Sequence, residues 1–224
     1  MNPCLYLKVL NWTVSKEHRT ECQYKGQEDW KCHNYITSFH GPFSGTENGP
    51  SNRYLVCGTN AFKPRCRFYI SNESSTNLGA HVEEFSGVGY SSFDPETAYT
   101  TLLHKGEVYS ATVGDLGGAD SLIYKKPLRT EKYYDKQLSS PTFVSSMSYG
   151  PSALFFFREK GAEFAGVGEG NKVVSRVARI CAGDSGTKKH KDRFSTFLKA
   201  RLKCSVPDDF PFFFDHLRKC KLFC

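Results

Sequence analysis

The sequence predicts an all-β fold of many short strands, arranged as a sandwich, a barrel or a propeller. Short apolar or alternating segments recur along the 224 residues, and stretches rich in glycine and proline separate them. Although only 39% of the residues are hydrophobic, 18 phenylalanines and 12 tyrosines supply bulky side chains for a core. Four cysteines lie in two closely spaced pairs, as in the small disulfide loops of extracellular modules.

Several segments carry the residue pattern of strands. Residues 107–113 place Tyr109, Ala111 and Val113 on one face by alternation. The aromatic run 155–157 is expected to lie in a buried central strand, because consecutive aromatic residues are commoner in cores than in ligand grooves. The other strands are predicted over residues 54–57, 67–70, 121–124, 153–157 and 172–180.

Residues 194–204 fit two kinds of structure. A helix would gather the apolar residues between Phe194 and Leu202 on one side, and many residues here are good helix formers. A strand would separate the apolar Leu198, Ala200, Leu202 and Cys204 from the basic Lys199, Arg201 and Lys203. We predict a strand, because this alternation has no exception between residues 198 and 204.

Three stretches have the composition of loops. They are rich in glycine, proline, serine and asparagine, and none resembles an interdomain linker. They cover residues 41–52, 86–95 and 161–170.

The cysteines indicate an oxidising compartment. Nine cysteines are many for a cytosolic chain of this length, and the odd number leaves at least one without an internal partner. Two N-glycosylation sequons, beginning at Asn11 and Asn72, agree with this compartment.

The N-terminal residues lack the signal peptide that an extracellular protein is expected to carry. Residues 1–10 contain no apolar run of the length that a signal peptide requires, and no stretch approaches the ~18 apolar residues of a transmembrane helix. We therefore expect the chain to be a piece of a longer extracellular protein.

A formal net charge of +7 does not indicate nucleic-acid binding here, because most basic residues are dispersed. The one basic cluster, Lys188-Lys189-His190-Lys191, follows Gly-Asp-Ser-Gly and is predicted to be a solvated loop.

Three motifs invite a catalytic or ligand-binding interpretation. Ser185 lies in a Gly-Asp-Ser-Gly sequence like that of trypsin-type proteases, but no segment supplies the histidine base. Glycines between residues 166 and 170 match no phosphate-binding motif. Cys22, Cys32 and His33 lack the spacing of a zinc site, and a disulfide between the two cysteines is favoured. We predict no catalytic residue, no cofactor site and no metal site.

Ordered motifs along the chain resemble the sema domain of semaphorins. The clearest is the run from Cys57 to Cys66, Cys-Gly-Thr-Asn-Ala-Phe-Lys-Pro-Arg-Cys. The resemblance extends over residues 11–217. The residues of its later blocks are more similar to those of semaphorin ligands than to those of the sema domains of plexin or Met-type receptors. Other matching blocks are Cys22-x-x-Lys-Gly, Cys32-x-Asn-Tyr-Ile, Phe93-Asp-Pro, Tyr109-Ser-Ala-Thr, Leu122-Ile-Tyr, Leu128-Arg-Thr-Glu, Phe143-Val-Ser, Phe155-Phe-Phe-Arg-Glu, Ser175-Arg-Val-Ala-Arg-Ile-Cys and Phe197-Leu-Lys-Ala-Arg-Leu-Lys-Cys-Ser-Val-Pro.

The resemblance implies a fold and a set of disulfides. A sema domain is a seven-bladed β-propeller, so residues 1–224 would form a partial sema domain of about two to three blades with atypical ends. Cys22 would pair with Cys32, and Cys57 with Cys66. In the family, the cysteines that match Cys181 and Cys204 pair with later residues, so both are expected to be unpaired in this chain.

The resemblance also implies a function. Semaphorins bind plexin receptors, act as homodimers, and steer axons and migrating cells as extracellular chemorepellents; they are not enzymes. No nucleic acid and no small-molecule substrate is expected as a partner. The alternatives are a plexin-like or Met-like receptor fragment, a truncated product without function, and a serine hydrolase that depends on Ser185.

Overall fold

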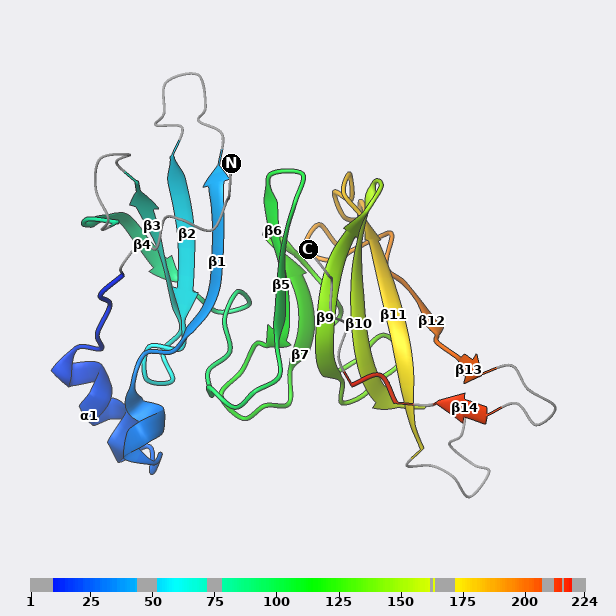
Figure 1. Cartoon of the computed structure of the whole chain (residues 1–224), viewed down its shortest axis with the longest axis horizontal. Helices are drawn as coiled ribbons and strands as arrows, with labels where there is room; N and C mark the ends of the chain where they lie inside the picture. Colours follow the sequence, from blue (N-terminus) through cyan, green and yellow to red (C-terminus); the bar gives the residue numbers. More distant parts are fainter. Residues whose placement is uncertain are drawn as a thin grey trace. The chain divides into compact units, whose positions relative to one another are not determined.

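The computed structural model describes residues 10–43, 52–71, 78–161, 163, 172–206, 212–214 and 216–218. The chain divides into two compact units, Met1–Thr97 and Ala98–Cys224. The described residues form three four-stranded sheets and one two-stranded sheet, and every pair of adjacent strands is antiparallel (Figure 1). The prediction of an all-β fold with short strands is confirmed.

The first unit contains one sheet in which sequence neighbours are also neighbours in space. The helix α1 (Lys16–Tyr24) and the short helix η1 (Asp29–Cys32) precede this sheet. Ser15 caps α1, since its hydroxyl accepts a hydrogen bond from the backbone N–H of His18. The strands are β1 (Ile36–Phe43), β2 (Arg53–Gly58), β3 (Arg65–Ile70) and β4 (His81–Ser86).

Two apolar clusters stabilise the first unit. In one, Trp12 packs with Val56, Tyr69 and Leu78, and the Arg67 guanidinium lies 4.2 Å from the centre of the Trp12 ring. The other joins the cystine Cys22–Cys32 to the buried turn residues between β2 and β3. The second cluster fixes α1, the blue helix in Figure 1, at the β2–β3 turn.

The second unit contains two four-stranded sheets, each a meander of consecutive strands. A shorter two-stranded sheet of β13 (Cys204–Val206) and β14 (Phe212–Phe214) follows them. The first meander consists of β5 (Thr100–His104), β6 (Glu107–Val113), β7 (Ser121–Lys125) and β8 (Leu128–Arg129). The second consists of β9 (Thr142–Tyr149), β10 (Ser152–Lys160), β11 (Val173–Cys181) and β12 (Leu198–Arg201).

A single apolar core lies between these two meanders. Tyr109 and Ile123 contribute from the first sheet, and Phe155, Phe157 and Ile180 contribute from the second. Strands β5 and β9 lie side by side (Figure 1), and the hydroxyls of Thr100 and Ser146 form a hydrogen bond of 2.8 Å there. The face-to-face packing of four-stranded meanders is the arrangement of adjacent propeller blades.

The aromatic run of β10 alternates between two environments. Phe155 and Phe157 are fully buried in the core, whereas Phe156 points to the opposite face and is partly exposed. The prediction of a buried central strand is confirmed, because β10 pairs with both β9 and β11.

The choice of strand over helix for residues 194–204 is confirmed at β12 and at Cys204, where β13 begins, whereas residues 194–197 and 202–203 belong to no strand. Within β12 the basic side chains are the less exposed ones. Leu198 is 58% exposed, whereas the amine of Lys199 pairs with the fully buried carboxylate of Glu159. Arg176 on β11 pairs with the same carboxylate at 3.0 Å. Lys199 of β12 therefore meets a buried acid, and its neighbour Leu198 faces solvent.

The predicted loops have different outcomes. Strand β1 continues to Phe43, so the loop predicted from residue 41 was placed too early, and residues 44–51 lie outside the described residues. Residues 87–95 form turns after β4, as predicted. Most of residues 161–170 lie outside the described residues.

Candidate interaction site

The two cysteine pairs form disulfides in the first unit. Cys22 at the end of α1 is joined to Cys32 in η1, and Cys57 on β2 is joined to Cys66 on β3. These are the pairings that the family resemblance implies. Because both sulfurs are consumed in the Cys22–Cys32 bond, this pair does not ligate zinc beside His33.

A half-buried asparagine connects the segments that carry these two disulfides. The Asn34 side-chain oxygen accepts a hydrogen bond of 2.9 Å from the backbone N–H of Asn60, in the turn between Cys57 and Cys66. Asn60 has a φ of +43°, a left-handed conformation that asparagine tolerates better than most residues. Gly58 leaves room for this contact, because a Cβ there would lie 2.3 Å from the same Asn34 oxygen.

The other predicted site residues lie apart from one another. Cys181, at the end of β11, is a partly exposed free thiol. Cys204 begins β13, and its side chain lies outside the described part of the chain. Asn11 is exposed, as glycosylation requires, whereas Asn72 is among the residues that the structure does not describe.

The Gly-Asp-Ser-Gly motif has a structural role that depends on its aspartate. Asp184 is 4% exposed, and its carboxylate accepts hydrogen bonds from the backbone N–H groups of Gly186, Ser195 and Thr196 at 2.7–2.9 Å. The hydroxyls of Ser195 and Thr196 also donate to it, at 2.8 and 2.6 Å. Ser185 itself is exposed, and no hydrogen bond to a histidine is found for it among the described residues. The motif is a turn that its aspartate closes.

The hydrogen bonds keep Asp184 ionised. Burial opposes ionisation, but the bonds from Thr196, Gly186 and Ser195 outweigh it and lower the pKa to about 2. Asp184 thus anchors the loop between β11 and β12.

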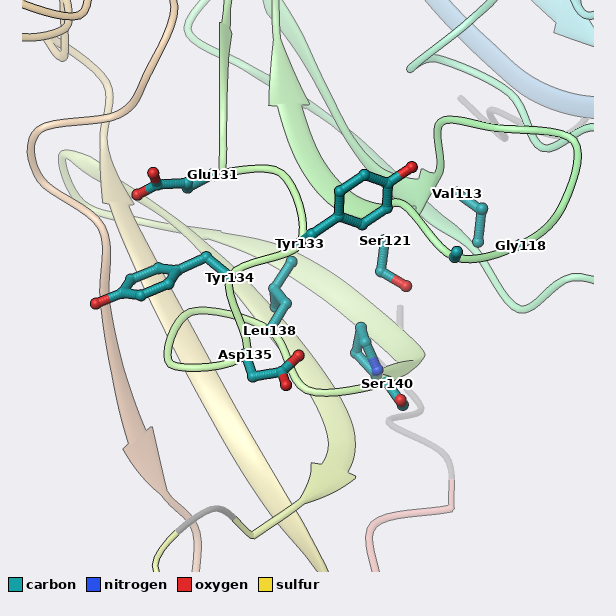
Figure 2. A pocket seen from close by; sticks show the side chains of 11 residues that line it. Val113, Gly118, Ser121, Glu131, Tyr133, Tyr134, Asp135, Leu138 and Ser140 are labelled. Atoms are coloured by element: carbon teal, nitrogen blue, oxygen red, sulfur yellow. The ribbon is translucent and has the colours of Figure 1, made fainter.

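A hollow of about 520 Å³ opens in the second unit between the β6–β7 loop and the segment that joins β8 to β9. We call it the tyrosine groove, after its two exposed aromatic side chains. Tyr133 is 64% exposed and Tyr134 is 39% exposed, while Leu138 at the base is 6% exposed. In Figure 2 the two tyrosine side chains leave the chain in opposite directions. The groove is lined by Val113, Gly118, Ala119, Ser121, Glu131, Tyr133, Tyr134, Asp135, Leu138, Ser140 and Pro141.

The backbone of the groove is strained at its rim and held at its base. Tyr133 and Ser140 adopt φ values of +53° and +46°, which are uncommon for residues with side chains. The N–H of Ser139 donates to the Glu159 carboxylate at 2.9 Å, which fixes the segment to β10. Strained backbone that the surrounding structure supports is frequent at functional sites.

Charged groups beside the groove are largely neutralised within the protein. Arg129 holds the 2%-exposed carboxylate of Asp120 with two hydrogen bonds, and Glu131 pairs with Arg193. The amine of Lys132 lies 4.8 Å from the centre of the Tyr133 ring. A concave surface with exposed tyrosines and paired charges fits a protein partner better than a small charged ligand.

Sequence reasoning did not identify the tyrosine groove. Its signal is the pair Tyr133-Tyr134 in a polar run between Thr130 and Gln137, where neither strand nor helix periodicity explains the aromatic residues. Within the described ranges, no cluster of side chains has the composition of a metal site. No helix there is both long and apolar enough to cross a membrane.

Relatives of known identity match most of the chain. Semaphorin-1A of Schistocerca americana is 41% identical over 212 residues, which are 93% of this chain and 27% of that protein. Human Semaphorin-6D is 39% identical over 220 residues, which are 94% of this chain and 19% of that protein. The chain therefore spans about a quarter or less of the length of these relatives. No protein-family model matches the chain.

Solved structures match the fold. The extracellular domains 1–2 of Drosophila Semaphorin 1b align with a TM-score of 0.79 and 40% identity, over 92% of this chain and 38% of that one. A structure of Drosophila Plexin A in complex with Semaphorin 1b aligns with a TM-score of 0.81 and 39% identity, over 94% and 38%. These neighbours are sema domains, which are β-propellers.

Proposed function

Because this chain is homologous to the sema domains of semaphorins over 93% of its length, we propose that it is part of an extracellular ligand for a plexin-type receptor. The single observation that carries the proposal is its likeness to Semaphorin 1b, which has been solved in complex with Drosophila Plexin A. Sema domains are signalling domains and not enzymes, which agrees with the structural role of Asp184 in the Gly-Asp-Ser-Gly turn.

We assign the receptor contact to the tyrosine groove. Tyrosine is enriched at the energetically dominant positions of protein interfaces, because it adds a large rigid apolar ring and a hydroxyl at low entropic cost. Tyr133 and Tyr134 offer both features on a segment that Leu138 and Ser139 fix to the core. The groove can therefore receive a partner without first being ordered.

Binding of the secreted chain to immobilised plexin ectodomains tests both parts of the proposal. Replacing Tyr133 and Tyr134 together by alanine is expected to weaken binding about tenfold or more, because truncating dominant aromatic contacts has this effect. The matched control replaces Tyr24 and Tyr149, which are 88% and 69% exposed elsewhere on the surface.

The outcomes separate the function from the site. Absence of binding of the unmodified chain to every plexin ectodomain contradicts the receptor assignment. If the two double variants lowered the affinity for plexin equally, the receptor assignment would remain, but the tyrosine groove would not be the contact site.

The biological role follows from the same proposal. The ligand would repel growing axons and migrating cells, it would act outside the cell or at its surface, and it would act as a homodimer. Both compact units would belong to one sema domain, since the alignments cover 92–94% of the chain. Collapse of growth cones on exposure to the protein measures the repellent activity, and unchanged growth cones would contradict it.

The receptor-fragment alternative has less support. The relatives reported above are semaphorins, not plexin-like or Met-like receptors, and the plexin in the solved complex is the partner of a semaphorin.

A further inference from the structure

A cluster of unpaired lysines lies on two segments of the second unit, and none of these lysines lines the tyrosine groove. Lys188, Lys189 and Lys191 are exposed in the loop between β11 and β12, and Lys126 is exposed in the turn between β7 and β8. Within the described ranges, none of these four lysines forms an ion pair. We call them the basic patch.

Two separate contacts bring the two parts of the basic patch together. The backbone N–H of Arg129 donates to the carbonyl of Asp192 at 2.8 Å, at one end of the lysine-bearing loop. At the other end, the amine of Lys125 lies 3.5 Å from the carbonyl of Asp184. The loop is thus laid along β8, next to the turn that carries Lys126.

The loop that carries the lysines is held in one shape. His190 and Thr187 form a closed turn, in which the His190 N–H donates to the Thr187 hydroxyl at 2.8 Å and the Thr187 N–H donates to the His190 carbonyl at 3.1 Å. Asp184 fixes the start of the loop through Gly186 and its end through Ser195. Positions fixed in this way lose less backbone entropy when a ligand binds.

The acidic residues nearby do not neutralise the patch. Asp184 is buried and satisfied by hydrogen bonds, Glu107 pairs with Lys125, and Glu131 pairs with Arg193. Asp192 is the one exposed acidic residue of the lysine-bearing loop. Four lysine charges therefore face one carboxylate, which leaves a concentrated positive surface.

We propose that the basic patch binds sulfated glycosaminoglycans, a function separate from receptor binding. Lysine amines are compact point charges that suit sulfate groups spaced along a flexible polyanion. The disulfides indicate an oxidising, extracellular compartment, which excludes DNA as the ordinary polyanionic partner. An anionic membrane surface fits less well, because no large hydrophobic residue of the lysine-bearing loop is exposed for insertion.

Affinity for immobilised heparin as a function of salt concentration tests the proposal. Release of counterions makes the logarithm of the affinity fall linearly with the logarithm of salt concentration. The triple variant Lys188→Gln, Lys189→Gln, Lys191→Gln is expected to lower that slope by about two to three, in line with the loss of roughly 0.7–0.9 per contact in other polyanion complexes. A triple variant with arginine at these positions should keep the slope.

A matched control distinguishes the patch from overall charge. Lys16, Lys105 and Lys136 are exposed lysines outside the patch, and replacing all three by glutamine changes the net charge by the same amount. The control should leave the slope nearly unchanged. Equal loss in the two glutamine variants would show a general charge effect and overturn the proposal.

Two further probes identify the polyanion. Binding to heparin should exceed binding to N- and O-desulfated heparin, and binding to phosphatidylserine vesicles should not depend on the patch. Equal binding to desulfated heparin, or vesicle binding that the patch alone controls, would overturn the assignment to sulfated glycosaminoglycans. Plexin binding measured on the same variants should be unchanged, so failure here is distinguishable from failure of the proposed function.

Discussion

Thr196 connects the free cysteine of β11 to the buried anion of the loop that follows it. Its hydroxyl accepts a hydrogen bond of 3.0 Å from the Cys181 N–H and donates one of 2.6 Å to the Asp184 carboxylate. The Thr196 N–H donates to the same carboxylate at 2.7 Å. The end of β11 and the approach to β12 are therefore held through a single acidic side chain.

Replacing Asp184 by asparagine is expected to destabilise the chain by about 2 kcal/mol at neutral pH, because hydrogen bonds to a charged acceptor are lost. Urea unfolding followed by circular dichroism measures this change. The control is Asp135→Asn at an exposed position, for which we expect little change. Equal midpoints for the two variants would contradict the anchoring role of Asp184.

The stability of the chain should also fall in acid because of Asp184. Its pKa is lowered from 3.8 to about 2 in the folded protein, so its contribution is fully present above pH 4. The contribution is lost as the pH falls from about 4 to about 2, where the carboxyl becomes protonated in the folded state as well. A series of thermal melts across this range, compared with Asp184→Asn, should show a smaller acid loss in the variant.

Gly58→Ala is expected to destabilise the first unit by roughly 2–3 kcal/mol. The added Cβ would lie 2.3 Å from the Asn34 side-chain oxygen and displace it from the Asn60 N–H, which leaves a buried donor without its partner. Gly183→Ala is the matched control, because an added Cβ there meets no atom within 4 Å. Differential scanning calorimetry of both variants would refute this account if their melting temperatures were the same.

Glu159→Gln is expected to cost about 3 kcal/mol of unfolding free energy. The carboxylate is fully buried between Arg176 and Lys199, and its neutral replacement leaves two cations with too little compensation. The more exposed pair of Glu21 and Lys63 serves for comparison. Glu21→Gln should change the free energy of unfolding very little. If chemical denaturation found both glutamine variants equally stable, the buried ion pairs of Glu159 would not contribute to the stability of the chain.

The sequence predicted strands whose residues alternate or form a short apolar run, and it missed several elements that have neither pattern. Strand β6 was predicted over its full extent, because Tyr109 and Ala111 repeat at the spacing of one sheet face. Helix α1 was missed because Cys22 is its one buried residue, so it has no apolar stripe. Strand β4 was missed for a related reason, since most of its side chains are exposed and polar.

The orientation of β12 needed information from another strand. Alternation alone shows that Leu198 and Lys199 lie on opposite faces, but it does not say which face is buried. The buried acid Glu159, on β10, makes the lysine face the inner one. The tyrosine groove was missed for the same reason, because it forms only when the segment after β8 is brought beside the β6–β7 loop.

The two disulfides bear on how a chain with nine cysteines avoids wrong pairings. Each bond joins cysteines that are consecutive in the sequence and separated by 10 and 9 positions. At a synthesis rate of about 5–20 residues per second, the second cysteine of each pair emerges about 0.5–2 s after the first. Each native partner is thus within reach long before Cys181 has been made. Oxidation of these two pairs can proceed in the order of synthesis and needs little correction by a disulfide isomerase.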